Sequence, residues 1–149
     1  MATTLTPAEL QSGERDLGTS SWHKIGQREI DQFAEATGDH QWIHVDPDMA
    51  KQGPFGTTIA HGYLSLSMLV MMLSEVLRVE GARMGINYGI DKVRFTAPVP
   101  VDSEVRLHAR LLRGEPRGEG VLYNVGVEVE IKGSDKPALV GEVVYLVFA

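Results

Sequence analysis

Regular alternation of apolar and polar side chains in the C-terminal half constrains the fold of this chain most. The alternation runs through residues 104–111 and 123–131. One apolar face on such segments is typical of antiparallel strands whose other face meets water. Two more strands are expected at residues 86–95 and 140–148, and a phase slip near Lys92 predicts a bulge in the first of them. The second half of the chain therefore predicts an antiparallel sheet.

The segment before these strands predicts one long helix over residues 60–79, apolar on nearly every side. Such a helix must be buried over most of its circumference. A sheet with a single apolar face can bury that face by wrapping around the helix. The predicted class is therefore α+β with a hot-dog fold, in which a curved antiparallel sheet encloses a central helix. Because an open sheet has unpaired edges, a homodimer is expected.

The first half of the chain predicts shorter elements within the same single domain of 149 residues. Residues 1–14 lack a clear period and are expected to be loose, and a short strand is expected at 20–25. Apolar residues at three- and four-residue spacing predict a helix over 27–37 that stops at Gly38. Residues 46–50 predict a small helix with an aspartate cap and a proline in its first turn.

Composition excludes several classes of function. The formal net charge of −6 argues against a nucleic-acid-binding protein, which needs a broad cationic surface. The absence of cysteine excludes disulfides, thiolate catalysis and cysteine-bound metal centres. No secretory signal is visible at the N-terminus, and the longest apolar stretch is too short to span a bilayer comfortably. The expected location is the cytoplasm.

Three of the five histidines lie between residues 39 and 61, beside several acids. Asp39 and His44 are five residues apart in a loop after a helix, so a carboxylate and an imidazole can face one cavity. Together they can hold a water molecule and move protons near neutral pH. Gly62 opens the long helix, where backbone N–H groups have no partner and can hold a carbonyl oxygen that gains negative charge. This set suits proton chemistry beside a thioester carbonyl.

The motif resembles that of the MaoC-like dehydratases, which are the (R)-specific enoyl-CoA hydratases, and in particular their single-hot-dog, NodN-like branch. The residues that carry the resemblance are Gly38-Asp39, Ile43-His44-Val45-Asp46, Phe55-Gly56 and Ile59-Ala60-His61-Gly62. It implies reversible addition of water to a trans-2-enoyl thioester, with a 3R-hydroxyacyl product. Asp39 and His44 match the catalytic pair, and Gly62 matches the glycine whose N–H polarises the thioester carbonyl.

The same resemblance implies an acyl-CoA or acyl-carrier-protein thioester as substrate and no metal or redox cofactor. Many relatives have Asn-Pro where this chain has Gln41-Trp42, a difference that bears on substrate shape. The further candidates for substrate contact are Gln41, Trp42, Phe55 and His61. For Trp42 and Phe55 the alternative is core packing, and for His61 it is a loop-anchoring hydrogen bond. Which of the catalytic pair is the acid stays open.

Competing interpretations rest on a few residues. A metal site is conceivable because His40 and His44 are four apart, but a zinc-protease helix would need Glu where Gln41 stands. A thioesterase would need a carboxylate on or opposite the central helix, which carries only Glu75 late in its course. A non-catalytic acyl-binding dimer is the third alternative. Near the bulge, Lys92 and Arg94 either meet coenzyme phosphates or are ordinary surface charges.

Overall fold

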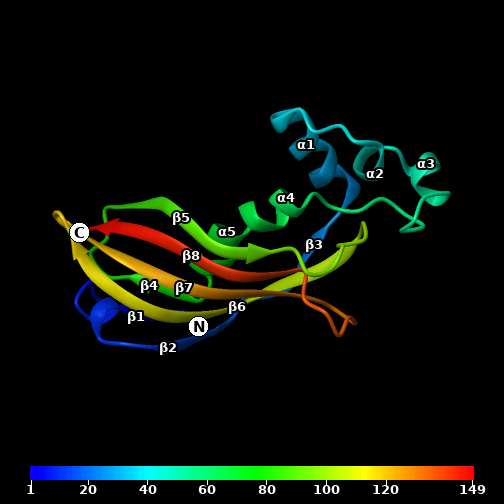
Figure 1. Ribbon diagram of the computed structural model, residues 1–149. Coiled ribbons are helices and arrows are strands. Elements are labelled where there is room, and N and C mark those ends of the chain that lie inside the picture. The colour runs from blue at the N-terminus through cyan, green and yellow to red at the C-terminus, as the bar shows by residue number, and fades with distance from the viewer.

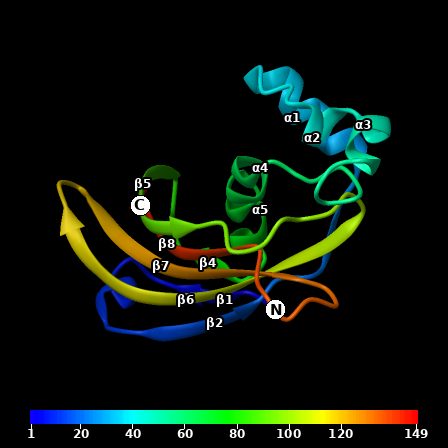
Figure 2. The ribbon, with the colours of Figure 1, turned by 45° about the vertical axis from the view of Figure 1, so that its right-hand side comes forward.

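A computed structural model describes residues 1–149 and has the α+β hot-dog architecture that the sequence predicts (Figure 1). The main sheet holds six strands: β2 (Arg15–Thr19), β3 (His23–Ile25), β5 (Met84–Arg94), β6 (Ser103–Arg117), β7 (Gly120–Ile131) and β8 (Leu139–Phe148). Their order is β2-β6-β7-β8-β5, β3 also pairs with β6, and every pair is antiparallel. The sheet curves beneath the central helices α4 (Gly62–Ser67) and α5 (Leu69–Ser74), as Figure 2 shows.

The alternation in β6 and β7 explains why the sheet curves around the helices. Val105, Leu107 and Leu111 have no solvent exposure, whereas Arg106 and Arg110 between them lie on the outer face. Burying each aliphatic side chain of this kind contributes about 1.5–3 kcal/mol. The apolar face of the sheet therefore has to close on the helices, which confirms the basis of the fold prediction.

The central helix differs from the prediction of one helix over residues 60–79. It is divided into α4 and α5 at Met68, and residues 77–79 instead form β4 (Leu77–Val79). β4 pairs in parallel with β1 (Thr3–Leu5), and the N–H of Thr3 donates to the carbonyl of Val76 at 2.8 Å. A continuous apolar run is compatible with a buried strand as well as with a helix. The sequence pattern alone therefore did not show that the helix ends and a strand begins at residue 77.

The helices are buried on one side only, which corrects the expected burial around most of their circumference. Leu69 and Met72 are enclosed by the sheet, whereas Val70 and Met71 are 49% and 42% exposed. The sheet reaches around one side of the helices and leaves the other side uncovered. An exposed apolar helix face of this kind needs a further partner.

The N-terminal residues 1–14, expected to be loose, are packed against the domain. They form β1 and a 3₁₀ turn, η1 (Glu9–Gln11), and bury Leu5 and Leu10 almost completely. The backbone of Leu10 crosses β6 so closely that a Cβ on Gly114 would lie 2.3 Å from its carbonyl oxygen. Two isolated leucines without a period gave no signal of this packing.

Strand β5 carries the predicted bulge. Its register with β8 shifts between Asp91 and Arg94, and Lys92 has a φ of 53° in the left-handed region. A second shift lies between Asn87 and Gly89. The shifts change the direction in which β5 side chains point, which explains the slip in the sequence pattern.

Three helices project beyond one end of the sheet (Figures 1 and 2). They are α1 (Gln27–Thr37), α2 (Trp42–Val45) and α3 (Pro47–Lys51). The prediction for α1 is confirmed, and Gly38 ends it with a φ of 82°. The prediction for α3 is confirmed as well, because the Asp46 side chain accepts a hydrogen bond from the N–H of Met49 at 3.0 Å. The single turn of α2 lies in a segment that the sequence pattern left irregular.

Candidate active site

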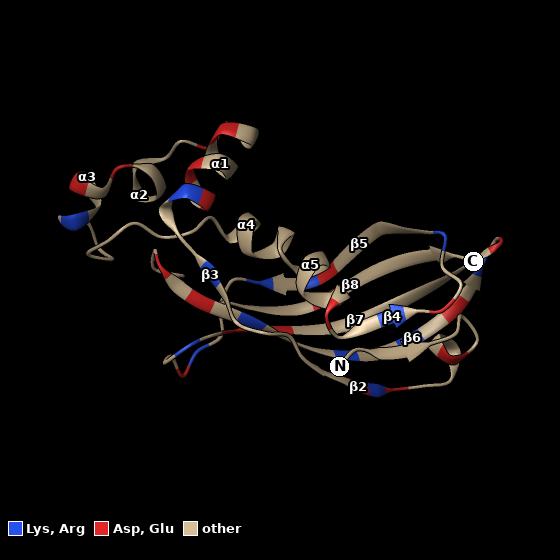
Figure 3. Ribbon diagram, turned by 180° about the vertical axis from the view of Figure 1, so that it is seen from behind, with Lys and Arg blue, Asp and Glu red and all other residues tan.

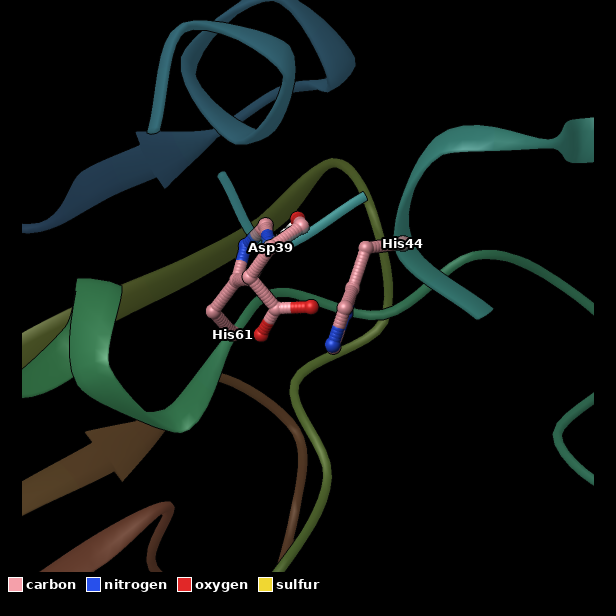
Figure 4. A group of neighbouring side chains, drawn as sticks. All are labelled: Asp39, His44 and His61. Carbon is pink, nitrogen blue, oxygen red and sulfur yellow. Dashed lines mark hydrogen bonds between the residues drawn. The ribbon is translucent and has the colours of Figure 1, made fainter. Parts of the chain in front are cut away.

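Asp39, His44 and His61 come from three separate segments and lie together (Figure 4). Asp39 follows the end of α1, His44 is on α2, and His61 immediately precedes α4. Their nearest carboxylate oxygen and ring nitrogen atoms all lie within 4.8 Å of one another. The structure thus brings together the predicted acid–base pair, with His61 as a third member.

His44 is held in one tautomer. Its Nδ1–H donates to the carbonyl oxygen of Ile59 at 2.7 Å, and this leaves Nε2 as a hydrogen-bond acceptor. Burial is the largest effect and lowers the pKa of His44; the hydrogen bond to Ile59 and the nearby Asp39 carboxylate act in the opposite direction but do not reverse it. The imidazole is therefore neutral near pH 7 and can accept a proton.

His61 anchors the loop that carries Asp39. Its Nε2–H donates to the backbone carbonyl of Asp39 at 2.9 Å, and its ring stacks on His44 with 3.9 Å between centroids. Of the two interpretations of His61, the structure supports the anchor. Its Nδ1 is buried and has no hydrogen-bond partner. His61 thus fixes both the Asp39 backbone and one face of the His44 ring.

The Asp39 side chain is exposed, and its carboxylate lies near both imidazoles (Figure 4). One of its carboxylate oxygens accepts a hydrogen bond from the N–H of Gln41 at 3.3 Å. The carboxylate and His44 Nε2 are both acceptors, and a water molecule has two protons to donate. A single water can therefore bridge the pair.

An open cleft of about 300 Å³ begins at His44. Phe55, Phe95 and Ile59 give it largely apolar walls, and Gly62 lies at its side. The N–H of Gly62 has no acceptor within the chain, as expected at the start of a helix. Few polar groups in an apolar cleft are typical of a small-molecule site.

Gly62 permits the close approach of an aromatic ring rather than an unusual backbone conformation. A Cβ at this position would lie 2.9 Å from the ring of Phe95. Any larger residue would therefore displace Phe95, which forms a wall of the cleft. The glycine keeps both the backbone N–H and the cleft accessible.

The other predicted contact residues lie in different places. Phe55 is 45% exposed and lines the cleft. Gln41 is exposed at the start of α2, and Trp42 packs on the backbone at Gly53, where a Cβ would lie 2.8 Å from its ring. Neither Gln41 nor Trp42 lines the cleft, and Trp42 instead holds the α2–α3 region together.

Sequence reasoning missed Gln27, which connects three parts of the site. Its Nε2 donates to the backbone carbonyl of His44 at 2.7 Å and to the carboxylate of Asp31 at 2.9 Å. Its Oε1 accepts the buried hydroxyl of Thr58 at 2.6 Å. As one polar residue among several in the first turn of a helix, Gln27 carried no signal in the sequence.

Replacing Gln27 with Ala is expected to lower the free energy of unfolding by about 1–3 kcal/mol, because Thr58 and the carbonyl of His44 lose a partner. Activity should fall too, since α2 carries His44. Denaturant unfolding and steady-state kinetics measure the two effects. The exposed Gln32 on the same helix supplies the matched control, and an equal loss in Gln32→Ala would contradict the role given to Gln27.

Comparison with known proteins identifies the family. Residues 9–132 match the family described as MaoC like domain. The chain belongs to the MaoC-like dehydratase family. It is 51% identical over 132 residues to 3-hydroxyacyl-thioester dehydratase Z of Mycobacterium tuberculosis. The aligned residues make up 88% of this chain and 87% of that protein.

Two further relatives confirm the resemblance seen in the motif. Nodulation protein N of Rhizobium leguminosarum bv. viciae is 45% identical over 128 residues, with 84% of this chain and 80% of that protein covered. Among solved structures, R-hydratase PhaJ1 of Pseudomonas aeruginosa matches with a TM-score of 0.75 at 25% identity. The superposed residues cover 95% of this chain and 84% of the PhaJ1 chain. This MaoC-like protein is accordingly a hydro-lyase, an enzyme that adds or removes water.

Glu75, the carboxylate on which a thioesterase interpretation depends, is engaged elsewhere. It accepts hydrogen bonds from the N–H and the hydroxyl of Ser21 at 2.8 and 2.7 Å, and it pairs with His23. The hydrogen bonds from Ser21 lower the pKa of Glu75, despite the opposing effect of burial. This MaoC-like domain therefore uses Glu75 to tie β3 to the end of the helices.

The remaining charged candidates lie away from the cleft. Lys92 and Arg94 are exposed on β5, and Arg94 donates to the backbone carbonyl of Val93 at 2.9 Å. His40 is exposed beside Glu35, with 3.8 Å between the ring nitrogen and the carboxylate. No helix in this MaoC-like domain has the length and apolar character needed to cross a bilayer.

Proposed function

We propose that the protein catalyses the reversible addition of water to a trans-2-enoyl thioester, giving a 3R-hydroxyacyl thioester. The observation that carries this proposal is that Asp39 lies within 4.8 Å of a ring nitrogen of His44, and that His44 lines an apolar cleft that Gly62 also lines. The dehydratase and R-hydratase relatives support the reaction class and a 3-hydroxyacyl thioester as substrate.

In the proposed mechanism, one water donates hydrogen bonds to Asp39 and to His44 Nε2. Its oxygen forms a bond to C3 of the enoyl thioester while one of the pair accepts a water proton. The π electrons of C2=C3 move toward the thioester oxygen, which rests on the N–H of Gly62, and C2 then receives the proton. Acid–base assistance of this kind contributes roughly 10²–10⁴-fold in rate.

The orientation of the donors supports acid–base chemistry and no metal cofactor. A metal ion on a histidine lies near the plane of the ring, along the nitrogen lone pair. The rings of His44 and His61 are stacked at an interplanar angle of 23°, so their lone pairs run side by side rather than toward one point. Asp39, His44 and His61 lie close enough for each to offer one atom to an ion, so the stacking of the two rings is the observation on which the metal-free proposal rests.

Coenzyme A is the proposed carrier of the acyl group. Acyl carrier proteins are usually acidic, and this chain has a net charge of −6, so the two would repel each other. The proposed location is the cytoplasm.

The proposal is tested by the loss of enoyl absorbance when the protein is mixed with crotonyl-CoA and with a longer 2-enoyl-CoA. Rapid loss is expected, with a 3R-hydroxyacyl-CoA as product on chiral analysis. Release of free thiol instead would identify a thioesterase. Tight binding of both thioesters without turnover would favour a non-catalytic acyl-binding protein.

A homodimer is part of the proposal, and strand β5 supports it. β5 is an edge strand, paired only with β8, and its residues 84–92 are exposed on both faces. Met84, Ile86, Tyr88 and Ile90 are each at least 41% exposed, and Figure 3 shows few charges along the strand before its last residues. Pairing of β5 with the β5 of a second copy would satisfy the free edge and cover these side chains.

The pH dependence follows from the lowered pKa of His44. Unfolded His44 binds a proton near its ordinary pKa of 6.5, whereas folded His44 does so only at lower pH. The stability that neutral His44 contributes is therefore fully present above 6.5 and is lost as the pH falls through the folded pKa. We expect kcat/KM to fall over the same acidic range.

An NMR titration of the His44 ring, assigned by comparison with His44→Gln, measures this pKa. Urea unfolding of both proteins across the acidic range tests the linked change in stability. A His44 midpoint at or above 6.5 would contradict the predicted direction.

A further inference from the structure

Ser65 carries a hydroxyl group that the folded chain leaves without a partner. The residue is 2% exposed, and its Oγ makes no hydrogen bond. It lies on α4 and lines the same cleft as His44 and Gly62. Leaving a buried hydroxyl unpaired is costly, so its position beside the proposed site requires an explanation.

The other hydroxyl groups on the helices behave differently. Each donates to a backbone carbonyl three or four residues earlier, as is usual in helices: Thr37 at 2.7 Å, Ser67 at 2.7 Å and Ser74 at 2.6 Å. The equivalent acceptor for Ser65 is the carbonyl of His61, which already receives the N–H groups of Leu64 and Ser65. Among the serine and threonine residues of these helices, only Ser65 makes no hydrogen bond to a local carbonyl.

The direction of the Ser65 side chain follows from helix geometry. Side chains in an α-helix point back toward the N-terminus, over the residues three and four positions earlier. For Ser65 those residues are Gly62 and His61. The unpaired hydroxyl and the unpaired N–H of Gly62 therefore belong to the same turn and border the same cleft.

We propose that the Ser65 hydroxyl donates the second hydrogen bond to the thioester carbonyl oxygen of the substrate, beside the N–H of Gly62. This inference rests on the proposed function and adds a substrate-binding residue to it. A carbonyl oxygen has two lone pairs and can accept both donors. The bonds strengthen as C3 is attacked and the oxygen gains charge, so Ser65 stabilises the transition state more than the bound substrate.

Ser65→Ala tests the proposal. One oxyanion donor contributes roughly 10²–10³-fold to kcat, so kcat with crotonyl-CoA should fall by that factor while KM changes little. The melting temperature should stay equal or rise, because an unpaired buried hydroxyl is removed. Ser74→Ala is the matched control, since the Ser74 hydroxyl is exposed and bonded within its own helix, and its kinetics should equal those of the wild type.

A second measurement does not need turnover. Butyryl-CoA with ¹³C at the thioester carbonyl has no double bond to hydrate, and its C=O stretch moves to lower frequency when the oxygen accepts hydrogen bonds. The wild type should lower the frequency of the bound thioester, and Ser65→Ala should lower it less. An unchanged frequency together with an unchanged kcat in Ser65→Ala would overturn the role of Ser65.

The two measurements separate this inference from the proposed function. A wild type that binds butyryl-CoA but hydrates no enoyl-CoA would overturn the hydratase proposal, while the carbonyl frequency would still decide whether Ser65 is a donor. A wild type that hydrates crotonyl-CoA through Asp39, with Ser65→Ala fully active, would overturn only the inference. A lowered melting temperature with unchanged kcat would make Ser65 a purely structural residue.

Discussion

Asp39→Asn is expected to lower kcat/KM for hydration of crotonyl-CoA by about 10²–10⁴-fold while the protein stays folded. The amide matches the carboxylate in shape but cannot accept a proton, and its NH₂ group cannot receive a hydrogen bond from water. Because Asp39 is exposed and makes only one weak side-chain contact, the hydrogen bond from Gln41 at 3.3 Å, its replacement should hardly change stability. Enoyl absorbance and thermal unfolding measure both quantities.

Asp48→Asn is the matched control for this prediction. Asp48 is an exposed aspartate on α3, nine positions further along the chain, and the chemical change is the same. Its kcat/KM should equal that of the wild type. Full activity of Asp39→Asn would remove Asp39 from the mechanism, and an equal loss in both variants would point to a general effect of charge on substrate binding.

The candidate residues that could be predicted from the sequence are those whose chemical type belongs to a recognisable motif. Asp39, His44 and Gly62 were proposed because they match the motif of the MaoC-like dehydratases, and the structure places Asp39 near His44 and brings His44 and Gly62 to one cleft. Gln27 is different, because its role is to position others through its amide. Many polar residues at the start of a helix look the same in sequence, and only the fold shows that Gln27 reaches the carbonyl of His44.

The fold was predictable where burial has a regular period. Strands β6 and β7 alternate over most of their length, and α1 has apolar residues on one face and a glycine stop. Two segments had no such signal. The parallel pairing of β1 with β4 depends on backbone hydrogen bonds between distant residues, and the apolar run through residues 69–79 satisfies a helix and a strand equally.

The exposed face of the central helices, which the sequence predicted to be buried, bears on the proposed homodimer. Val70 and Met71 remain exposed in a single chain, on the helices that the sheet should enclose. The exposed side chains of β5 are likewise apolar from Met84 to Ile90, apart from Asn87 and two glycines. The sequence pattern predicted that Val70 and Met71 are buried. That prediction holds only if a second copy of the chain covers them.

Ile86→Asp is expected to convert the proposed dimer into a folded monomer. Pairing of two β5 strands would cover residue 86 in each copy, so the substitution would bury a carboxylate on each strand of the interface. Thr19→Asp adds the same charge on β2, the opposite edge of the sheet, and should stay dimeric. Sedimentation equilibrium gives the masses and circular dichroism the folded state. A wild type that sediments as a monomer, or dimers of Ile86→Asp as stable as the wild type, would show that β5 is not the interface.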